Sequence, residues 1–188
     1  MPSRAPARVR FEARLQRPAR PADADWAFLV LTGSASSKLP TRSQVSVEGT
    51  LAGAAFQATL EPDGQGSHWL RVGPALLGAA VARAGDTVAL DVMPVTQEPE
   101  PVVPPDLDAA LAANPAARAT WDDITPLARR DWIQWVTSGK KAATRVKSLA
   151  TACDKLASGQ RRACCFDRSG MYSRGNLGPP EAPTDAHG

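Results

Sequence analysis

The chain has 188 residues, 43% hydrophobic and 22% charged, and 22 Lys and Arg against 19 Asp and Glu give it a net charge of +3. These values are typical of a globular protein and exclude a disordered or fibrous chain. The longest apolar runs, residues 26–31 and 74–82, fall short of the roughly 18 residues that span a bilayer.

The first hundred residues have the pattern of a β domain. Six short segments either alternate apolar and polar residues or form brief apolar runs, and several are separated by Gly-containing turns. These segments are residues 9–15, 26–31, 45–50, 54–60, 67–72 and 87–93. Residues 74–84 begin with Pro and predict one short helix. Because an open sheet would leave two unpaired edges, the pattern predicts a small, closed, six-stranded β-barrel within residues 1–96.

The period becomes helical after a proline-rich stretch. Four of the nine residues 97–105 are Pro, which predicts a semi-rigid extended linker. Helices are then predicted at residues 106–113, 115–121, 126–138 and 140–158. In the last of these, Val146, Leu149, Cys153 and Leu156 are spaced as one buried stripe.

The expected fold class is therefore α+β. The barrel is followed by the linker and by a helical region over residues 106–160, which we expect to pack on the barrel. Residues 161–188 have no period and are rich in Pro and Gly, so we expect an irregular, largely disordered tail.

Charge is distributed unevenly along the chain. Residues 1–20 carry six Arg and one Glu, whereas residues 125–175 carry eleven Lys and Arg against three Asp. A basic segment of this kind indicates either an anionic partner, nucleic acid included, or a solvated helix face.

The inventory of reactive side chains is small. The two His residues are His68 and His187, and His187 lies in the expected tail, which excludes a folded site with two His ligands. The Cys count is odd and two of the three are adjacent, which favours reduced thiols. Together with the lack of an apolar secretory segment, this predicts a cytoplasmic protein.

Short strings in both parts of the chain carry a family resemblance. The strings in the first part include Phe11-Glu12-Ala13, Leu39-Pro40-Thr41-Arg42, Val47-Glu48-Gly49-Thr50 and Gly85-Asp86-Thr87-Val88. They resemble the β-barrel family called domain of unknown function 1905. Those in the second part include Pro104-Pro105-Asp106-Leu107, Ile124-Thr125-Pro126, Thr144-Arg145 and Gly159-Gln160-Arg161-Arg162. They are similar to the YdeI/OmpD-associated region, often labelled bacteriocin-protection. The resemblance implies a small barrel with a helical appendage and no established activity.

Two groups of residues are candidates for a site. The candidate ligand-binding residues are His68, Trp69, Arg129, Trp132, Lys141 and Arg145, since cations interleaved with aromatic rings suit an anionic ligand. The candidate metal or redox residues are Cys153, Cys164 and Cys165, which lie near several cations that favour thiolates. Packing is the alternative for each of them: a His bonded to a backbone carbonyl, core Trp residues, Arg145 paired with an acid, and buried thiols.

The leading hypothesis is a cytoplasmic binding or stress-protection protein that binds a small anionic molecule or peptide at the junction of barrel and helices. A nucleic-acid-binding protein with an AbrB-like barrel is one alternative, and a thiol-based redox or metal-binding protein is another. An enzyme is less favoured because no set of catalytic groups is evident, and no cofactor is expected. The oligomeric state is left open.

Overall fold

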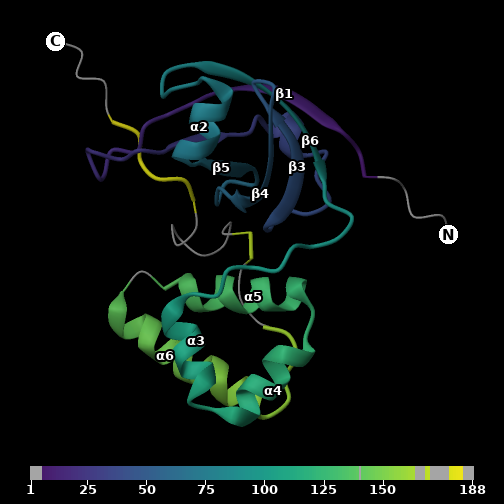
Figure 1. The fold of residues 1–188 in the computed structure, drawn as a ribbon, viewed down its shortest axis with the longest axis vertical. Coiled ribbons are helices and arrows are strands. Elements are labelled where there is room, and N and C mark those ends of the chain that lie inside the picture. Colours follow the sequence, from purple (N-terminus) through teal and green to yellow (C-terminus); the bar gives the residue numbers. More distant parts are fainter. Residues whose placement is uncertain (1–5, 140, 164–167, 170–177, 184–188) are drawn as a thin grey trace. The chain divides into compact units, whose positions relative to one another are not determined.

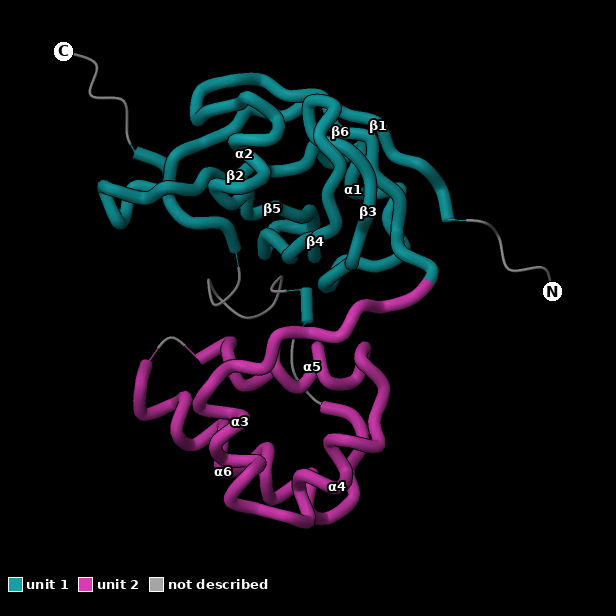
Figure 2. Tube along the Cα trace, in the orientation of Figure 1, with its two compact units in different colours: residues 1–96, 168–188 teal, residues 97–167 magenta. Residues whose placement is uncertain are grey.

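The computed structural model describes residues 6–139, 141–163, 168–169 and 178–183. The chain divides into two compact units, Met1–Thr96 with Arg168–Gly188, and Gln97–Asp167 (Figure 2). Each has its own apolar core. Among the described residues, no helix combines the length and the apolar character that crossing a membrane requires.

The first unit is built on six antiparallel strands in the order β1-β6-β3-β4-β5-β2 (Figure 1). The strands are β1 (Val9–Arg14), β2 (Ala27–Val30), β3 (Val45–Leu51), β4 (Ala54–Pro62), β5 (His68–Val72) and β6 (Thr87–Pro94). Just beyond β1, Gln16 forms a bridge with Phe28 of β2, with N···O distances of 2.7 and 2.9 Å in the two directions. This bridge joins the two end strands, so the barrel is nearly closed. Together with the helices of the chain, the barrel confirms the predicted α+β class.

Two helices accompany the strands. The four-residue helix α1 (Gly33–Ser36) was not predicted, and α2 (Pro74–Ala80) is shorter than the expected helix over residues 74–84. The ladder between β4 and β5 comprises two pairs, Glu61 with Trp69 and Pro62 with His68. Helix α2 contacts β4 and packs its Leu76, Leu77 and Ala80 against the barrel core. The helix thus covers core residues beside the short β4–β5 ladder.

The second unit contains α3 (Pro105–Ala112), α4 (Pro115–Asp123), α5 (Pro126–Thr137) and α6 (Ala142–Ala157). Pro stands in the first turn of α3, α4 and α5, where its missing N–H has no intrahelical partner to lose. The side chains of Asn114 and Thr125 accept hydrogen bonds from Ala117 N and Ala128 N and so cap α4 and α5.

The core of the helical unit includes Leu107, Leu111, Trp121, Trp132, Val136 and Leu156. The stripe expected on α6 is wrong at its first position, because Val146 is 66% exposed. Its buried side begins at Leu149, which packs against the core together with Cys153 and Leu156. The proline-rich stretch also belongs to this unit, where Val103 packs against the same core.

Gly49 allows β3 and β6 to approach closely. It pairs with Val92 of β6 on one side and with Phe56 of β4 on the other. A Cβ atom built at Gly49 would lie 1.9 Å from the backbone oxygen of Asp91. Since that oxygen belongs to a neighbouring strand, no small side-chain adjustment can make room for it.

We expect Gly49→Ala to lower the free energy of unfolding by about 2–3 kcal/mol, because the new methyl group would push β3 and β6 apart. Gly78→Ala is the matched control, since Gly78 lies within α2 with open space around its Cβ position. This control should stabilise by roughly 0.5–1 kcal/mol. Urea denaturation of both variants measures the difference, and equal stabilities would contradict the close approach.

Val81 follows α2 in the left-handed conformation, with φ 52°, and is 91% exposed. A β-branched residue is strained there, whereas Gly is the usual residue at such a helix end. Val81→Gly should therefore raise the free energy of unfolding by roughly 0.5–1 kcal/mol, after the larger backbone entropy of Gly is subtracted. Val102→Gly is the control, because Val102 is 92% exposed without a positive φ. A gain in melting temperature for both variants, or for neither, would contradict the role of strain.

Candidate functional site

His68 lies inside the barrel with both ring nitrogens engaged. Its Nε2 is 2.8 Å from the backbone oxygen of Ser43, and its Nδ1 is 2.6 Å from the hydroxyl oxygen of buried Ser36. A carbonyl only accepts, so Nε2 carries the proton and Nδ1 accepts the Ser36 hydroxyl. Desolvation by burial lowers the pKa of His68, and the hydrogen bond to Ser43 opposes this only partly. The ring is thus neutral at pH 7 and fixes the segment that contains Ser36 and Ser43 to β5.

Trp69 faces the opposite side of β5, because successive side chains of a strand alternate. Its ring meets Phe28 edge to face at 6.3 Å between centroids. The indole nitrogen is buried without a hydrogen-bond partner among the described residues. His68 and Trp69 therefore do not form one constellation, although they are adjacent in the sequence.

The arginines of the candidate site pair with groups of the helical unit. Arg145 on α6 forms a two-pronged contact with Asp106, with Nε and Nη2 at 2.6 and 2.8 Å from the carboxylate oxygens. Its hydrogen bond lowers the pKa of Asp106. Arg129 on α5 donates to the backbone oxygens of Trp121 and Asp122 at the end of α4, and to Glu100. Arg129 thus satisfies carbonyls at a helix C-terminus, where a cation is favourable.

Further ion pairs join the basic segment to an acidic one. Arg130 pairs with Glu98 at 2.6 Å, and Arg161 pairs with Asp123. With Arg129–Glu100 and Arg145–Asp106, every one of these four contacts joins residues 129–161 to residues 98–123. Residues 97–123 carry six acids and one Arg. The fold therefore pairs at least four of the eleven Lys and Arg of residues 125–175 with acids of the same unit.

The two remaining ligand-binding candidates of this unit, Trp132 and Lys141, lie at different places. Trp132 is buried in the core, and its indole N–H points to the backbone oxygen of Arg161 at 3.4 Å. Its edge-to-face neighbour is Trp135, whose ring in turn faces the Lys155 ammonium at 5.7 Å. Lys141 is exposed just before α6. The structure thus places Trp132 in packing and leaves Lys141 open to solvent.

Cys153 is buried in the helical core. Burial, and secondarily the charge of Asp154, raise the pKa of its thiol, which disfavours the reactive thiolate. Cys164 and Cys165 lie outside the described residues. No cluster of three metal-ligating side chains occurs within the described part of the chain.

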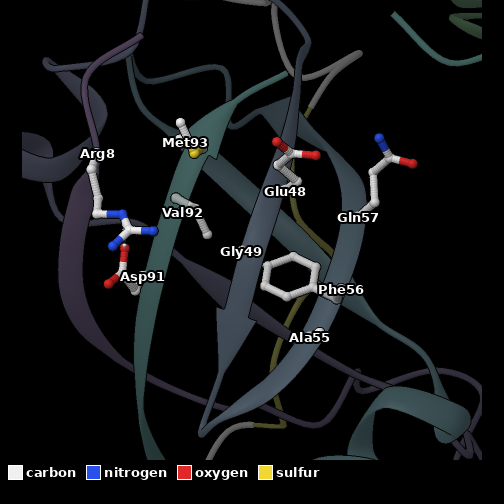
Figure 3. A pocket seen from close by; sticks show the side chains of 9 residues that line it. All are labelled: Arg8, Glu48, Gly49, Ala55, Phe56, Gln57, Asp91, Val92 and Met93. Atoms are coloured by element: carbon white, nitrogen blue, oxygen red, sulfur yellow. Dashed lines mark ion pairs between the residues drawn. The ribbon is translucent and has the colours of Figure 1, made fainter. Parts of the chain in front are cut away.

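A groove across β6, β3 and β4 presents a different set of polar groups (Figure 3). It has a volume of about 550 Å³ and is lined by Arg8, Glu48, Gly49, Ala55, Phe56, Gln57, Asp91, Val92 and Met93. The Phe56 ring lies beside Gly49, where a side chain is missing. Sequence patterns did not reveal this groove, because it depends on the register that aligns the three strands.

Asp91 holds two arginines at the edge of the groove. Its carboxylate oxygens contact Nε of Arg8 at 3.2 Å and Nε of Arg10 at 2.9 Å. Arg10 lies directly opposite Asp91 in the β1–β6 ladder. A second depression, of about 430 Å³, lies beside Arg10 and also includes Asp91. We call the groove with the two arginines and Asp91 the Arg8–Arg10 groove.

The buried His68 should make stability depend on pH. An unfolded His takes up a proton near pH 6.5, whereas the folded protein resists protonation to a lower pH. The contribution of neutral His68 to the free energy of unfolding is therefore complete above pH 6.5. It is lost as the pH falls from the pKa of the unfolded His to the lower pKa of the folded one. His68→Gln should be less stable at pH 7 and should lack this part of the pH dependence in urea denaturation.

Ser36→Ala provides the control for this prediction. It leaves Nδ1 buried without its hydroxyl donor, which should lower the free energy of unfolding by about 1–3 kcal/mol. His68 still titrates in this variant, so the slope of stability against pH should persist. An identical slope in His68→Gln and the unaltered chain would refute the assignment to His68.

The two parts of the chain match two family models in order. Residues 100–159 match the model described as Bacteriocin-protection, YdeI or OmpD-Associated. Residues 11–92 match the model described as Domain of unknown function (DUF1905). A comparison with curated proteins gives no match. The resemblance carried by the short sequence strings is confirmed, and the chain joins a DUF1905 domain to a YdeI/OmpD-associated region.

Proposed function

We propose that this chain is a binding protein whose ligand is a small anionic molecule or a short peptide, held in the Arg8–Arg10 groove of the barrel. The observation that carries the proposal is the sharing of one carboxylate by two arginines. Asp91 contacts Nε of each guanidinium, and among the residues that the structure describes no hydrogen bond involves their terminal NH2 groups. The Arg8 and Arg10 side chains are 60% and 74% exposed.

This arrangement suits a carboxylate or a phosphate. The two guanidinium groups and Asp91 leave a charge of +1, which Glu48 balances over the groove as a whole. The shared contact with Asp91 restricts the motion of both arginines. A guanidinium offers donors in a planar fork that matches an anionic oxygen pair. Because part of the ordering precedes binding, less conformational entropy is lost when the ligand arrives.

The rest of the groove favours a peptide over a simple anion. Glu48 is an exposed carboxylate on β3, and Gln57 offers an amide on β4. Met93 supplies apolar surface near these polar groups, whereas Phe56 is partly buried against the barrel core. A ligand with a carboxylate, an apolar side chain and an ammonium group would use all three kinds of contact.

Binding is better supported than catalysis by the placement of the titratable groups. His68, the usual choice for proton transfer at neutral pH, is buried and bonded on both ring nitrogens. The groove offers guanidinium, carboxylate and amide groups, which hold ligands well. The description of the matched family, bacteriocin protection, is compatible with a protective binding role. A cytoplasmic location remains part of the proposal, based on the odd number of cysteines and the adjacent pair.

The dipeptide Gly-Phe and inorganic phosphate are suitable probes, followed by NMR titration of the 15N-labelled full chain, including the Arg Nε–H signals. We expect Gly-Phe to shift the signals of Arg8 and Arg10, and the double substitution Arg8→Gln with Arg10→Gln to weaken binding at least tenfold. Arg71→Gln is the matched control, since Arg71 is exposed on β5 and stacks on Trp26. Equal affinities of the double variant and the control would overturn the proposed site.

Glu48→Gln separates a peptide from a simple anion. It should weaken Gly-Phe, whose ammonium group loses a carboxylate, and should leave phosphate binding unchanged or slightly stronger. If Gly-Phe affinity does not change, the peptide assignment fails, while the anion site at Arg8 and Arg10 is still judged by the double variant.

A further inference from the structure

A proline-rich segment far along the chain lies against the barrel. Its sequence is Gly178-Pro179-Pro180-Glu181-Ala182-Pro183. The compact unit that contains the barrel also contains these residues (Figure 2). Three of the six residues are Pro, so φ is fixed near −65° at half of the positions and the segment lacks half of its N–H groups. It can therefore accept hydrogen bonds on its carbonyls but cannot pair as a regular strand.

The segment meets the barrel at two separate turns. The Ala19 N–H, between β1 and β2, donates to the backbone oxygen of Glu181 at 2.7 Å. Gly178 lies against the turn between β4 and β5, where a Cβ atom would come within 3.1 Å of the Asp63 backbone oxygen. A polyproline II chain makes no internal hydrogen bonds, so its carbonyls are free to accept from a backbone donor of the domain.

Next to the hydrogen bond lies a depression of about 350 Å³. The barrel contributes Arg14, Leu15, Gln16, Arg17, Ala84 and Gly85, and the segment contributes Ala182 and Pro183. The two arginines are exposed, and the segment carries one acid, Glu181. The charges of the two sides are thus complementary.

We propose that residues 14–19 and 84–85 form a peptide-binding surface for an extended, proline-rich, acidic segment of a partner protein. In the isolated chain, its own residues 178–183 take this place. Among the described residues, one backbone hydrogen bond joins the segment to the barrel, and residues 181–183 are exposed. The intramolecular contact is therefore weak enough to exchange. The intramolecular segment competes through its high effective concentration, not through many contacts.

The test uses the 15N-labelled full chain and a variant with Pro179→Ser, Pro180→Ser and Pro183→Ser, whose melting temperature confirms that it folds. In the variant, hydrogen exchange at the Ala19 amide should accelerate at least tenfold. A fluorescein-labelled peptide with the sequence of residues 178–183 should bind the variant at least tenfold more tightly than the unaltered chain, and it should slow Ala19 exchange again. The same peptide with Ser in place of its three Pro is the control ligand.

Three results would overturn the proposal. An unchanged rate of hydrogen exchange at the Ala19 amide in the variant would show that the prolines do not hold the segment on the barrel. Equal peptide affinities of the variant and the unaltered chain would show that the surface does not exchange its occupant. A dimer of the unaltered chain that is lost in the variant would assign the surface to the segment of a second copy instead. Arg14→Gln with Arg17→Gln should weaken peptide binding, whereas Arg8→Gln with Arg10→Gln should not, which separates this surface from the Arg8–Arg10 groove.

Discussion

The barrel depends on the close approach of β3 and β6 at Gly49, because this contact sets the path of its most extensively paired strands. With no side chain between the Gly49 backbone and the Asp91 carbonyl, β3 can pair with both β4 and β6. The same approach fixes Asp91, whose carboxylate is the common partner of Arg8 and Arg10. One missing methyl group thus supports both the pairing of β3 with β6 and the geometry of the proposed binding groove.

The charge of residues 125–175 in the sequence differs from the charge that the folded helical unit leaves unpaired. Residues 125–175 suggest a basic surface, but four of their arginines meet carboxylates of residues 98–123. Two of these carboxylates, Glu98 and Glu100, belong to the proline-rich stretch, so that stretch is held on the helices by charge as well as by Val103. This pairing weakens the case for nucleic acid, which would need unneutralised cations.

Local patterns predicted the strands and the longer helices of both units, because each has a hydrophobic period or a Pro or Gly at its end. Helix α1 has only four residues and no period, so it was missed. Val146 keeps the helical spacing yet lies outside the buried face, since packing begins one turn later. The Arg8–Arg10 groove depends on cross-strand register, and the partners of Arg129 and Arg145 depend on how helices pack, neither of which sequence spacing specifies.

The bond between Ala19 and Glu181 also has a consequence for the order of folding. The chain leaves the barrel unit at Thr96, completes the helical unit and then returns, so this contact closes a loop of nearly the whole sequence. The entropy lost in closing a flexible loop rises only slowly with its length, but contacts between distant residues form late. A helical unit that folds first converts most of this loop into a compact body. Residues 178–183 then bind the barrel last, after both cores have formed.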